Sequence, residues 1–166
     1  EMLTEASIEY VKNQVKSGID CFQLFETYSG IISNEDYKNF ILPLSTKILL
    51  EARESGVPTI FFPKNFNEGL KYINKEMCDY VSVDYDISLD NARNLLDSEV
   101  GIQGNMDPKI FYQEIDEIEN YLKSLIDFGS KNTDWIFNLG HGFRPDIDHI
   151  KVKYVVEWIK NTNWKR

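Results

Sequence analysis

A histidine between two glycines, Gly140-His141-Gly142, is the clearest candidate for chemistry in this sequence. Glycines let a ligand approach the backbone closely, and a histidine can hydrogen-bond a carboxylate or transfer a proton near neutral pH. The motif follows the apolar run Trp135-Ile136-Phe137-Asn138-Leu139, which predicts a buried strand. The alternative is a histidine that only fixes the loop after that strand, and the residues alone leave both interpretations open.

Polar residues follow four other apolar runs in the same way. They are Glu26-Thr27-Tyr28, Lys64-Asn65, Asp84-Tyr85-Asp86 and Gln103-Gly104-Asn105-Met106-Asp107. In the last of these, Asp107 before proline is typical of a helix N-cap, whereas Gln103 and Asn105 could face a ligand or hold neighbouring loops. Asp84 and Asp86 would share one face of a continuing strand, which suggests a metal or a general base. Capping or solvated carboxylates are the commoner interpretation.

Metal-ligating residues are sparse in the sequence. Asp146, Asp148 and His149 resemble a ligand set, but Asp148 fits the N-cap of the last predicted helix. Cys21 and Cys78 are far apart and have no CxxC or His-x-Cys partner, so we expect no metal site. Gly-rich phosphate loops are absent from the sequence. Two isolated cysteines suit a reducing, cytoplasmic compartment better than a disulfide scaffold.

The elements that position these residues alternate between strand and helix. The predicted strands are the apolar runs at 21–25, 59–62, 80–83, 100–103 and 135–139. The predicted helices are 3–17, closed by Gly18; 33–56, kinked at Pro43 and ended by Gly56; 69–77; 88–96, capped by Ser88; a segment after Pro108 that continues through Ile126; and 150–160.

This alternation of strands and helices predicts an α/β fold. Near-continuous apolar strands indicate a parallel sheet that helices cover on both faces. A doubly wound open sheet or a (β/α)8 barrel could hold them, and either fold places a site at the carboxyl ends of the strands. Five units are too few for a closed barrel, which takes about 250 residues, so the pattern alone favours a flavodoxin-like sheet.

Composition restricts the partners that we expect. With 42% apolar residues in 166, the chain can bury a core, which excludes intrinsic disorder. Eighteen basic against 27 acidic residues give a net charge of −9, which argues against nucleic-acid and anionic-membrane partners. No apolar run reaches the roughly 18 residues needed to span a bilayer, and no signal-peptide pattern is visible.

Four segments, in order and over residues 3 to 160, resemble the uroporphyrinogen decarboxylase family. They are Gly18-Ile19-Asp20 through Gln23-Leu24-Phe25-Glu26 and Gly30; Phe62-Pro63-Lys64; Gln103-Gly104-Asn105-Met106-Asp107-Pro108; and Asn138-Leu139-Gly140-His141-Gly142. The chain departs from the family where Tyr85 replaces the usual Trp, Met106 replaces Leu, and Phe143 replaces Leu or Ile. These replacements keep the fold and bear on fine specificity.

The resemblance implies that residues 1–166 form a single partial domain. This domain would be the C-terminal five or so βα units of a TIM-like (β/α)8 barrel, with the N-terminal part of the barrel absent. The family is implied to be a homodimeric carboxy-lyase of haem (porphyrin) biosynthesis. It decarboxylates the four acetate side chains of uroporphyrinogen III to give coproporphyrinogen III. No cofactor is implied, because a protonated pyrrole of the tetrapyrrole substrate can itself accept the electrons.

The resemblance also carries two substrate-binding residues over to this chain. Thr27 matches the hydroxyl position after a Phe-Glu pair, and His141 matches the histidine that hydrogen-bonds a substrate carboxylate. Lys64 and Arg144 lie at the same rim and could assist electrostatically. The catalytic aspartate, the arginine-rich segment and a substrate-binding tyrosine of the family belong to the absent part. We therefore expect the 166-residue chain by itself to be catalytically inactive.

Two other functions stay open at this point. A zinc- and corrinoid-dependent methyltransferase of the same superfamily would need a His-x-Cys pair and a further cysteine at the strand ends, and zinc analysis would detect it. A non-catalytic half-barrel that binds a tetrapyrrole applies if the natural gene begins near Glu1. The sequence upstream of that residue would discriminate this function from the enzyme.

Overall fold

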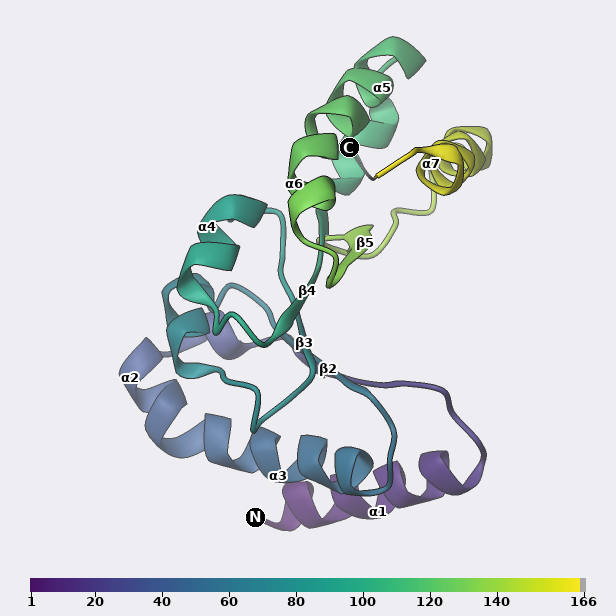
Figure 1. Cartoon of the computed structure of the whole chain (residues 1–166). Coiled ribbons are helices and arrows are strands. Elements are labelled where there is room, and N and C mark those ends of the chain that lie inside the picture. Colours follow the sequence, from purple (N-terminus) through teal and green to yellow (C-terminus); the bar gives the residue numbers. More distant parts are fainter. Residues whose placement is uncertain (165–166) are drawn as a thin grey trace.

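A curved parallel sheet forms the centre of the molecule (Figure 1). The structure is a computed structural model that describes residues 1–164. Its strands are β1 (Phe22–Glu26), β2 (Thr59–Pro63), β3 (Tyr80–Ser82), β4 (Gly101–Met106) and β5 (Trp135–Leu139). All neighbouring strands pair in parallel. The five predicted strands are therefore confirmed, with ends that differ by at most three residues.

The strand order decides between the two architectures that the sequence left open. The order is β1-β2-β3-β4-β5, so each strand pairs with the next one along the chain. A flavodoxin-like sheet instead reverses direction at a switch point and places its first strand inside the sheet. The flavodoxin-like prediction from the pattern alone is wrong, and the structure is an α/β partial TIM-like barrel, as the resemblance implied.

Coverage of both sheet faces, the other prediction from the pattern, is also wrong. One face packs against helices, and its side chains Phe61, Val81 and Ile102 are at most 1% exposed. The opposite, concave face is open at the two outer strands, where Phe25 of β1 is 64% exposed and Ile136 of β5 is 37% exposed. Apolar strands predict burial on both faces, but they do not say whether helices or other strands provide it.

The first helix precedes β1, the next helices connect consecutive strands, and the last helix follows β5. They are α1 (Met2–Lys16), η1 (Ser29–Ile31), α2 (Asn34–Asp36), the π-helical η2 (Tyr37–Ile41), α3 (Leu42–Glu54), η3 (Asn67–Tyr72), α4 (Leu89–Leu95), η4 (Pro108–Tyr112), α5 (Ile115–Ser124), α6 (Ile126–Lys131) and α7 (His149–Asn161). Gly18 and Gly56 follow the ends of α1 and α3 at φ of 82° and 81°, which confirms both predicted helix ends.

Two helical predictions are refined by local chemistry. Pro43 has no N–H to donate to the preceding turn, and the π-helical turn η2 stands directly before α3, where the kink was predicted. The predicted helix 69–77 is wrong beyond residue 72, because only the short 3-10 helix η3 forms and Ile73 is already extended. A Cβ on Gly69 would lie 2.2 Å from the Phe66 ring, so this segment is shaped by ring packing.

Candidate functional site

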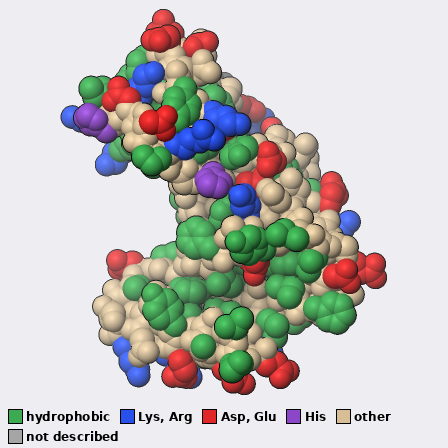
Figure 2. Space-filling view, turned by 180° about the vertical axis from the view of Figure 1, so that it is seen from behind, with side chains coloured by type: hydrophobic (Ala, Val, Ile, Leu, Met, Phe, Trp, Pro, Cys, Tyr) green, Lys and Arg blue, Asp and Glu red, His purple; other side chains and the backbone are tan. Residues whose placement is uncertain are grey.

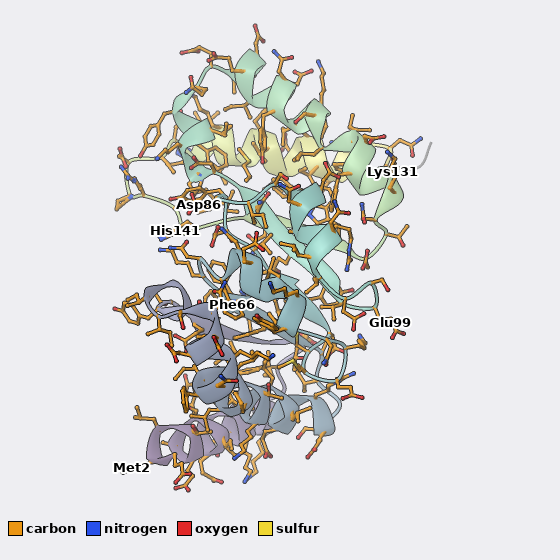
Figure 3. The ribbon with its side chains drawn as sticks, turned by 90° about the vertical axis from the view of Figure 1, so that its left-hand side faces the viewer. Met2, Phe66, Asp86, Glu99, Lys131 and His141 are labelled. Atoms are coloured by element: carbon orange, nitrogen blue, oxygen red, sulfur yellow. The ribbon has the colours of Figure 1, made fainter. Side chains whose placement is uncertain are left out.

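The polar residues that follow the strands lie along one rim of the sheet. Figure 3 shows His141 and Asp86, which follow β5 and β3, on one side of the ribbon. Glu99 and Lys131, which precede β4 and β5, lie on the other side (Figure 3). The predicted concentration of polar groups at the carboxyl ends of the strands is therefore found in the structure.

Asp84 is a structural carboxylate at this rim. It is 3% exposed, and its two oxygens accept hydrogen bonds from the backbone N–H groups of Asn65 at 2.6 Å and Asp86 at 3.0 Å. Asp84 and Asp86 were expected to share one strand face, but β3 ends at Ser82, and Asp86 is exposed while Asp84 is buried. With both oxygens engaged, Asp84 holds the loops after β2 and β3 together.

Gln103 and Asn105 of β4 also hold neighbouring segments. The Asn105 side-chain amide donates to the backbone carbonyls of Asp84 at 2.8 Å and Ile87 at 2.5 Å. The Gln103 amide donates to the Ser82 hydroxyl at 3.1 Å and to the side-chain oxygen of a glutamine in β1 at 3.3 Å. Of the two interpretations left open by the sequence, the structure supports the bracing of loops and strands.

The remaining acidic candidates act as caps or partners of side chains. Asp107 accepts from the Lys109 N–H at 2.9 Å, and Asp148 accepts from the Ile150 N–H at 2.8 Å, so both predicted N-caps are confirmed. Asp146 accepts a hydrogen bond from the Tyr112 hydroxyl at 2.9 Å. Partial desolvation first, and then this bond to Asp146, raise the pKa of Tyr112 above its ordinary value.

The Gly140-His141-Gly142 segment combines a fixed backbone with an exposed imidazole. Gly140 donates its N–H to the Met106 carbonyl at 2.9 Å, and a Cβ added there would lie 2.4 Å from the Tyr85 nitrogen. Glycine is therefore required for contact between two loops. His141 is exposed, and its Nδ1 lies 3.3 Å from the carbonyl of adjacent Gly142. The imidazole is thus presented at the rim by a loop that Gly140 anchors.

Two cavities meet at His141. The first, which we call the apolar cavity, has a volume of about 430 Å³, and its walls include Phe25 and Phe62 on the concave face and Phe137 of β5. The second, which we call the cationic cavity, has a volume of about 240 Å³, and its walls include Lys109 and Arg144. Figure 2 shows an indentation between the upper and the lower part of the molecule, with Lys, Arg and His side chains gathered above it and hydrophobic side chains gathered below it. His141 belongs to the walls of both cavities.

The structure brings the other candidate residues together only in part. Arg144 lines the cationic cavity beside His141. Thr27 is exposed in the loop after β1, two residues beyond Phe25, and lines neither of the two cavities. Lys64 is half-buried, and its backbone N–H donates to the Glu26 carbonyl at 3.1 Å. Thr27 and His141 thus stand at opposite ends of one rim, after the first and last strands.

The two cysteines lie away from this rim. Cys21 precedes β1 and Cys78 precedes β3, which places both at the amino ends of strands. Burial raises the pKa of the Cys78 thiol to about 12, which disfavours the thiolate that zinc requires. Residues 1–164 contain no group of three His, Cys, Asp or Glu side chains placed to hold a metal ion. No helix in that same range is long and apolar enough to cross a bilayer.

Comparison with known proteins decides what this rim belongs to. The family described as uroporphyrinogen decarboxylase (URO-D) matches residues 1–162. The chain belongs to the uroporphyrinogen decarboxylase family. It is 34% identical over 159 residues to the uroporphyrinogen decarboxylase of Vesicomyosocius okutanii, with 95% of this chain and 46% of that protein covered. With the enzyme of Chlorobium luteolum the identity is 36% over 162 residues, covering 95% and 46%.

The uroporphyrinogen decarboxylase relatives are about twice as long as this chain. With the enzyme of Geobacter sulfurreducens the identity is 30% over 165 residues, which cover 99% of this chain but 48% of that protein. The chain thus spans about half the length of the relatives it matches. A chain that spans about half of a barrel leaves part of its concave face open, as the structure shows.

Sequence reasoning missed several residues that line the cavities. Lys109 and Tyr112 line the cationic cavity, and Phe111 lines the apolar cavity. Lys109 follows the Asp107-Pro108 cap, and its ammonium nitrogen lies 5.9 Å from the centre of the Tyr85 ring. The signal that could have found it is its position just past a strand-end cluster.

Proposed function

We propose that this chain is the carboxyl-terminal part of a uroporphyrinogen decarboxylase and that its rim binds the tetrapyrrole substrate. The observation that carries the proposal is the position of His141 between the apolar cavity and the cationic cavity. Uroporphyrinogen combines apolar pyrrole rings with carboxylate side chains, so it needs both kinds of surface side by side. A histidine at the boundary can hydrogen-bond a carboxylate while the ring lies against Phe25 and Phe62.

The reaction implied by the family is cofactor-free decarboxylation of acetate side chains in haem biosynthesis. A proton added to a pyrrole carbon makes that ring an electron acceptor. The bond between the acetate methylene and its carboxylate then breaks, its electron pair enters the ring, and CO2 leaves. A second proton on the methylene carbon and loss of the first restore the pyrrole and leave a methyl group.

In this reaction the residues of this chain orient the substrate. We assign His141 to a substrate carboxylate and Thr27, through its hydroxyl, to a polar group on the opposite side of the rim. The exposed Phe25 and half-buried Phe62, whose rings pack edge to face with centres 5.9 Å apart, provide an apolar surface for a pyrrole ring. The carboxylate that stabilises the cationic ring would come from the rest of the barrel.

Completion of the barrel is part of the proposal. The concave face exposes Phe25 and Ile136, and β1 and β5 each pair with one strand only among residues 1–164. Apolar surface and free strand edges of this kind favour pairing with further strands. We propose that the remaining strands of the barrel cover this face, and that the chain alone is inactive. A cytoplasmic homodimer is the assembly expected from the family.

The test is complementation with the half that this chain lacks. The purified chain is assayed for conversion of uroporphyrinogen, alone and co-expressed with the amino-terminal half of the Geobacter sulfurreducens relative. We expect no product from the chain alone and coproporphyrinogen from the pair. Thr27→Val in the complemented enzyme should lower activity, and the matched Thr27→Ser, which keeps the hydroxyl, should retain it.

Two outcomes would contradict the proposal. Turnover by the chain alone would contradict its dependence on the rest of the barrel. Tetrapyrrole binding by a complemented complex that never releases CO2 would favour the non-catalytic binding half-barrel instead. The methyltransferase alternative is not supported, because both cysteines lie at the amino ends of strands, away from the rim.

A further inference from the structure

The cationic cavity concentrates positive charge on a chain that is strongly acidic. The chain has a net charge of −9, yet two of the side chains that line this cavity are Lys109 and Arg144. Asp107 is the acidic residue of the described wall, and one of its oxygens accepts the Lys109 backbone N–H as a helix cap. The balance of charge inside the cavity is therefore positive, against the sign of the whole molecule.

Neither cation is used to hold the fold through an ion pair. Within residues 1–164, Lys109 and Arg144 form no salt bridge, whereas other lysines and arginines do. The Lys109 ammonium lies over the Tyr85 ring, with 5.9 Å to its centre. Arg144 interacts with the Tyr112 hydroxyl, which itself donates to Asp146. Both cationic heads thus lie beside aromatic side chains, and neither forms an ion pair with a carboxylate in the described part of the chain.

The loop that carries Arg144 is anchored without its guanidinium. The Phe143 ring packs on the Phe111 ring with centres 5.4 Å apart, and the Ile147 N–H donates to the backbone carbonyl of Arg144 at 3.2 Å. Side-chain replacement at Arg144 leaves both contacts intact. A role in binding explains this arginine better than a role in folding does.

We infer that the cationic cavity is a carboxylate-binding subsite in which Arg144 and Lys109 receive one carboxylate. Its assignment to a carboxylate arm of the tetrapyrrole rests on the proposed function. The planar guanidinium can hold both oxygens of a carboxylate, and the ammonium adds a second charge-assisted hydrogen bond. A volume of about 240 Å³ holds one side arm but not a macrocycle. His141, shared with the apolar cavity, stands where the arm joins the ring.

The test titrates the purified 166-residue chain with two probes. Uroporphyrin, the stable oxidised form of the macrocycle, is followed by its fluorescence, and propane-1,2,3-tricarboxylate by calorimetry. Arg144→Met and Lys109→Met should each weaken binding of both probes roughly tenfold or more, as expected for loss of a charge-assisted hydrogen bond. Arg144→Lys should keep part of the affinity. The matched control is Lys131→Met, which removes a cation paired with Asp127 in α6.

The outcomes separate this subsite from the proposed function. If uroporphyrin binds and both methionine variants bind within twofold of wild type, the subsite is wrong and the proposed function stands. If the tricarboxylate binds through Arg144 while uroporphyrin does not bind, the subsite stands and the tetrapyrrole function is wrong. If the wild-type chain binds neither probe, the inference is overturned. Circular dichroism of each variant checks that the fold is retained.

Discussion

Gly140→Ala is the substitution that the structure predicts to be most informative about the rim. A Cβ at position 140 would lie 2.4 Å from the backbone nitrogen of Tyr85 and 2.9 Å from the carbonyl carbon of Asp84. Both contacts are with backbone atoms, which cannot rotate away as a side chain does. The loop after β5 must therefore move away from the loop after β3, and His141 moves with it.

The magnitude follows from this geometry. Forcing an extra carbon into a packed contact costs about 1–3 kcal/mol in the free energy of unfolding. For a domain of this size, each kcal/mol shifts the midpoint of thermal unfolding by about 2–4 °C. We therefore expect Gly140→Ala to unfold about 2–12 °C below wild type in a circular dichroism melt. The displacement of His141 should also weaken uroporphyrin binding.

Gly142→Ala is the matched control two residues along the same loop. No atom lies within 4 Å of a Cβ added at Gly142, so the same chemical change meets open space. We expect its stability to stay within about 0.5 kcal/mol of wild type. Equal stabilities of the two variants, or a Gly140→Ala protein as stable as wild type, would refute the argument that contact between the two loops positions His141.

Three further predictions concern buried or partly buried groups that support the rim and the sheet. Asp84→Asn replaces one of two acceptor oxygens by an amide that faces backbone N–H groups. The free energy of unfolding measured in urea should therefore fall by about 1–3 kcal/mol, whereas Asp86→Asn at the exposed neighbouring position should change it little. Burial would raise the pKa of Asp79, but hydrogen bonds from neighbouring threonine and lysine residues outweigh it and hold that pKa below its ordinary value. The stability from this carboxylate is present above about pH 4 and is lost as the pH falls through the lowered pKa. Between about pH 5 and pH 3, the urea concentration at half-unfolding should therefore fall less for an Asp79→Asn variant than for wild type. The Cys78 thiol, with a pKa of about 12, should react with a disulfide reagent at pH 8 only after unfolding, whereas exposed Cys21 should react in the native protein; fast reaction of both would contradict the packing.

Much of the fold could be predicted because its signals are local. Apolar runs identify the five strands, and short polar side chains identify the helix starts: Ser33 accepts from the Asp36 N–H at 3.1 Å and Ser88 from the Asn91 N–H at 3.2 Å. Strand order and the open face depend on which segments meet in space, and the pattern alone does not contain that information. The helix predicted at 69–77 failed because ring packing around Gly69 outweighed helical periodicity.

The sequence was sufficient to predict the rim at which the candidate site lies, but not which side chains line its two cavities. Strand-end position was sufficient to single out His141 and Arg144, which the structure brings together in the cationic cavity. It was not sufficient for Asp84, whose buried hydrogen bonds make it structural, or for Lys109, whose side chain reaches the cavity from the short helix η4. Whether a strand-end side chain braces a loop or faces a cavity depends on contacts between loops that are distant in sequence.

A nuclear magnetic resonance titration of the two histidines of the chain with uroporphyrin tests substrate binding at the rim most directly. The chain contains only His141 and His149, and the latter has a side chain that is 92% exposed and lines neither cavity, so it serves as an internal control. We expect the imidazole signal of His141 to shift in a saturable way while that of His149 stays in place. A titration in which neither signal moves, or in which both move equally, would contradict a tetrapyrrole-binding rim centred on His141.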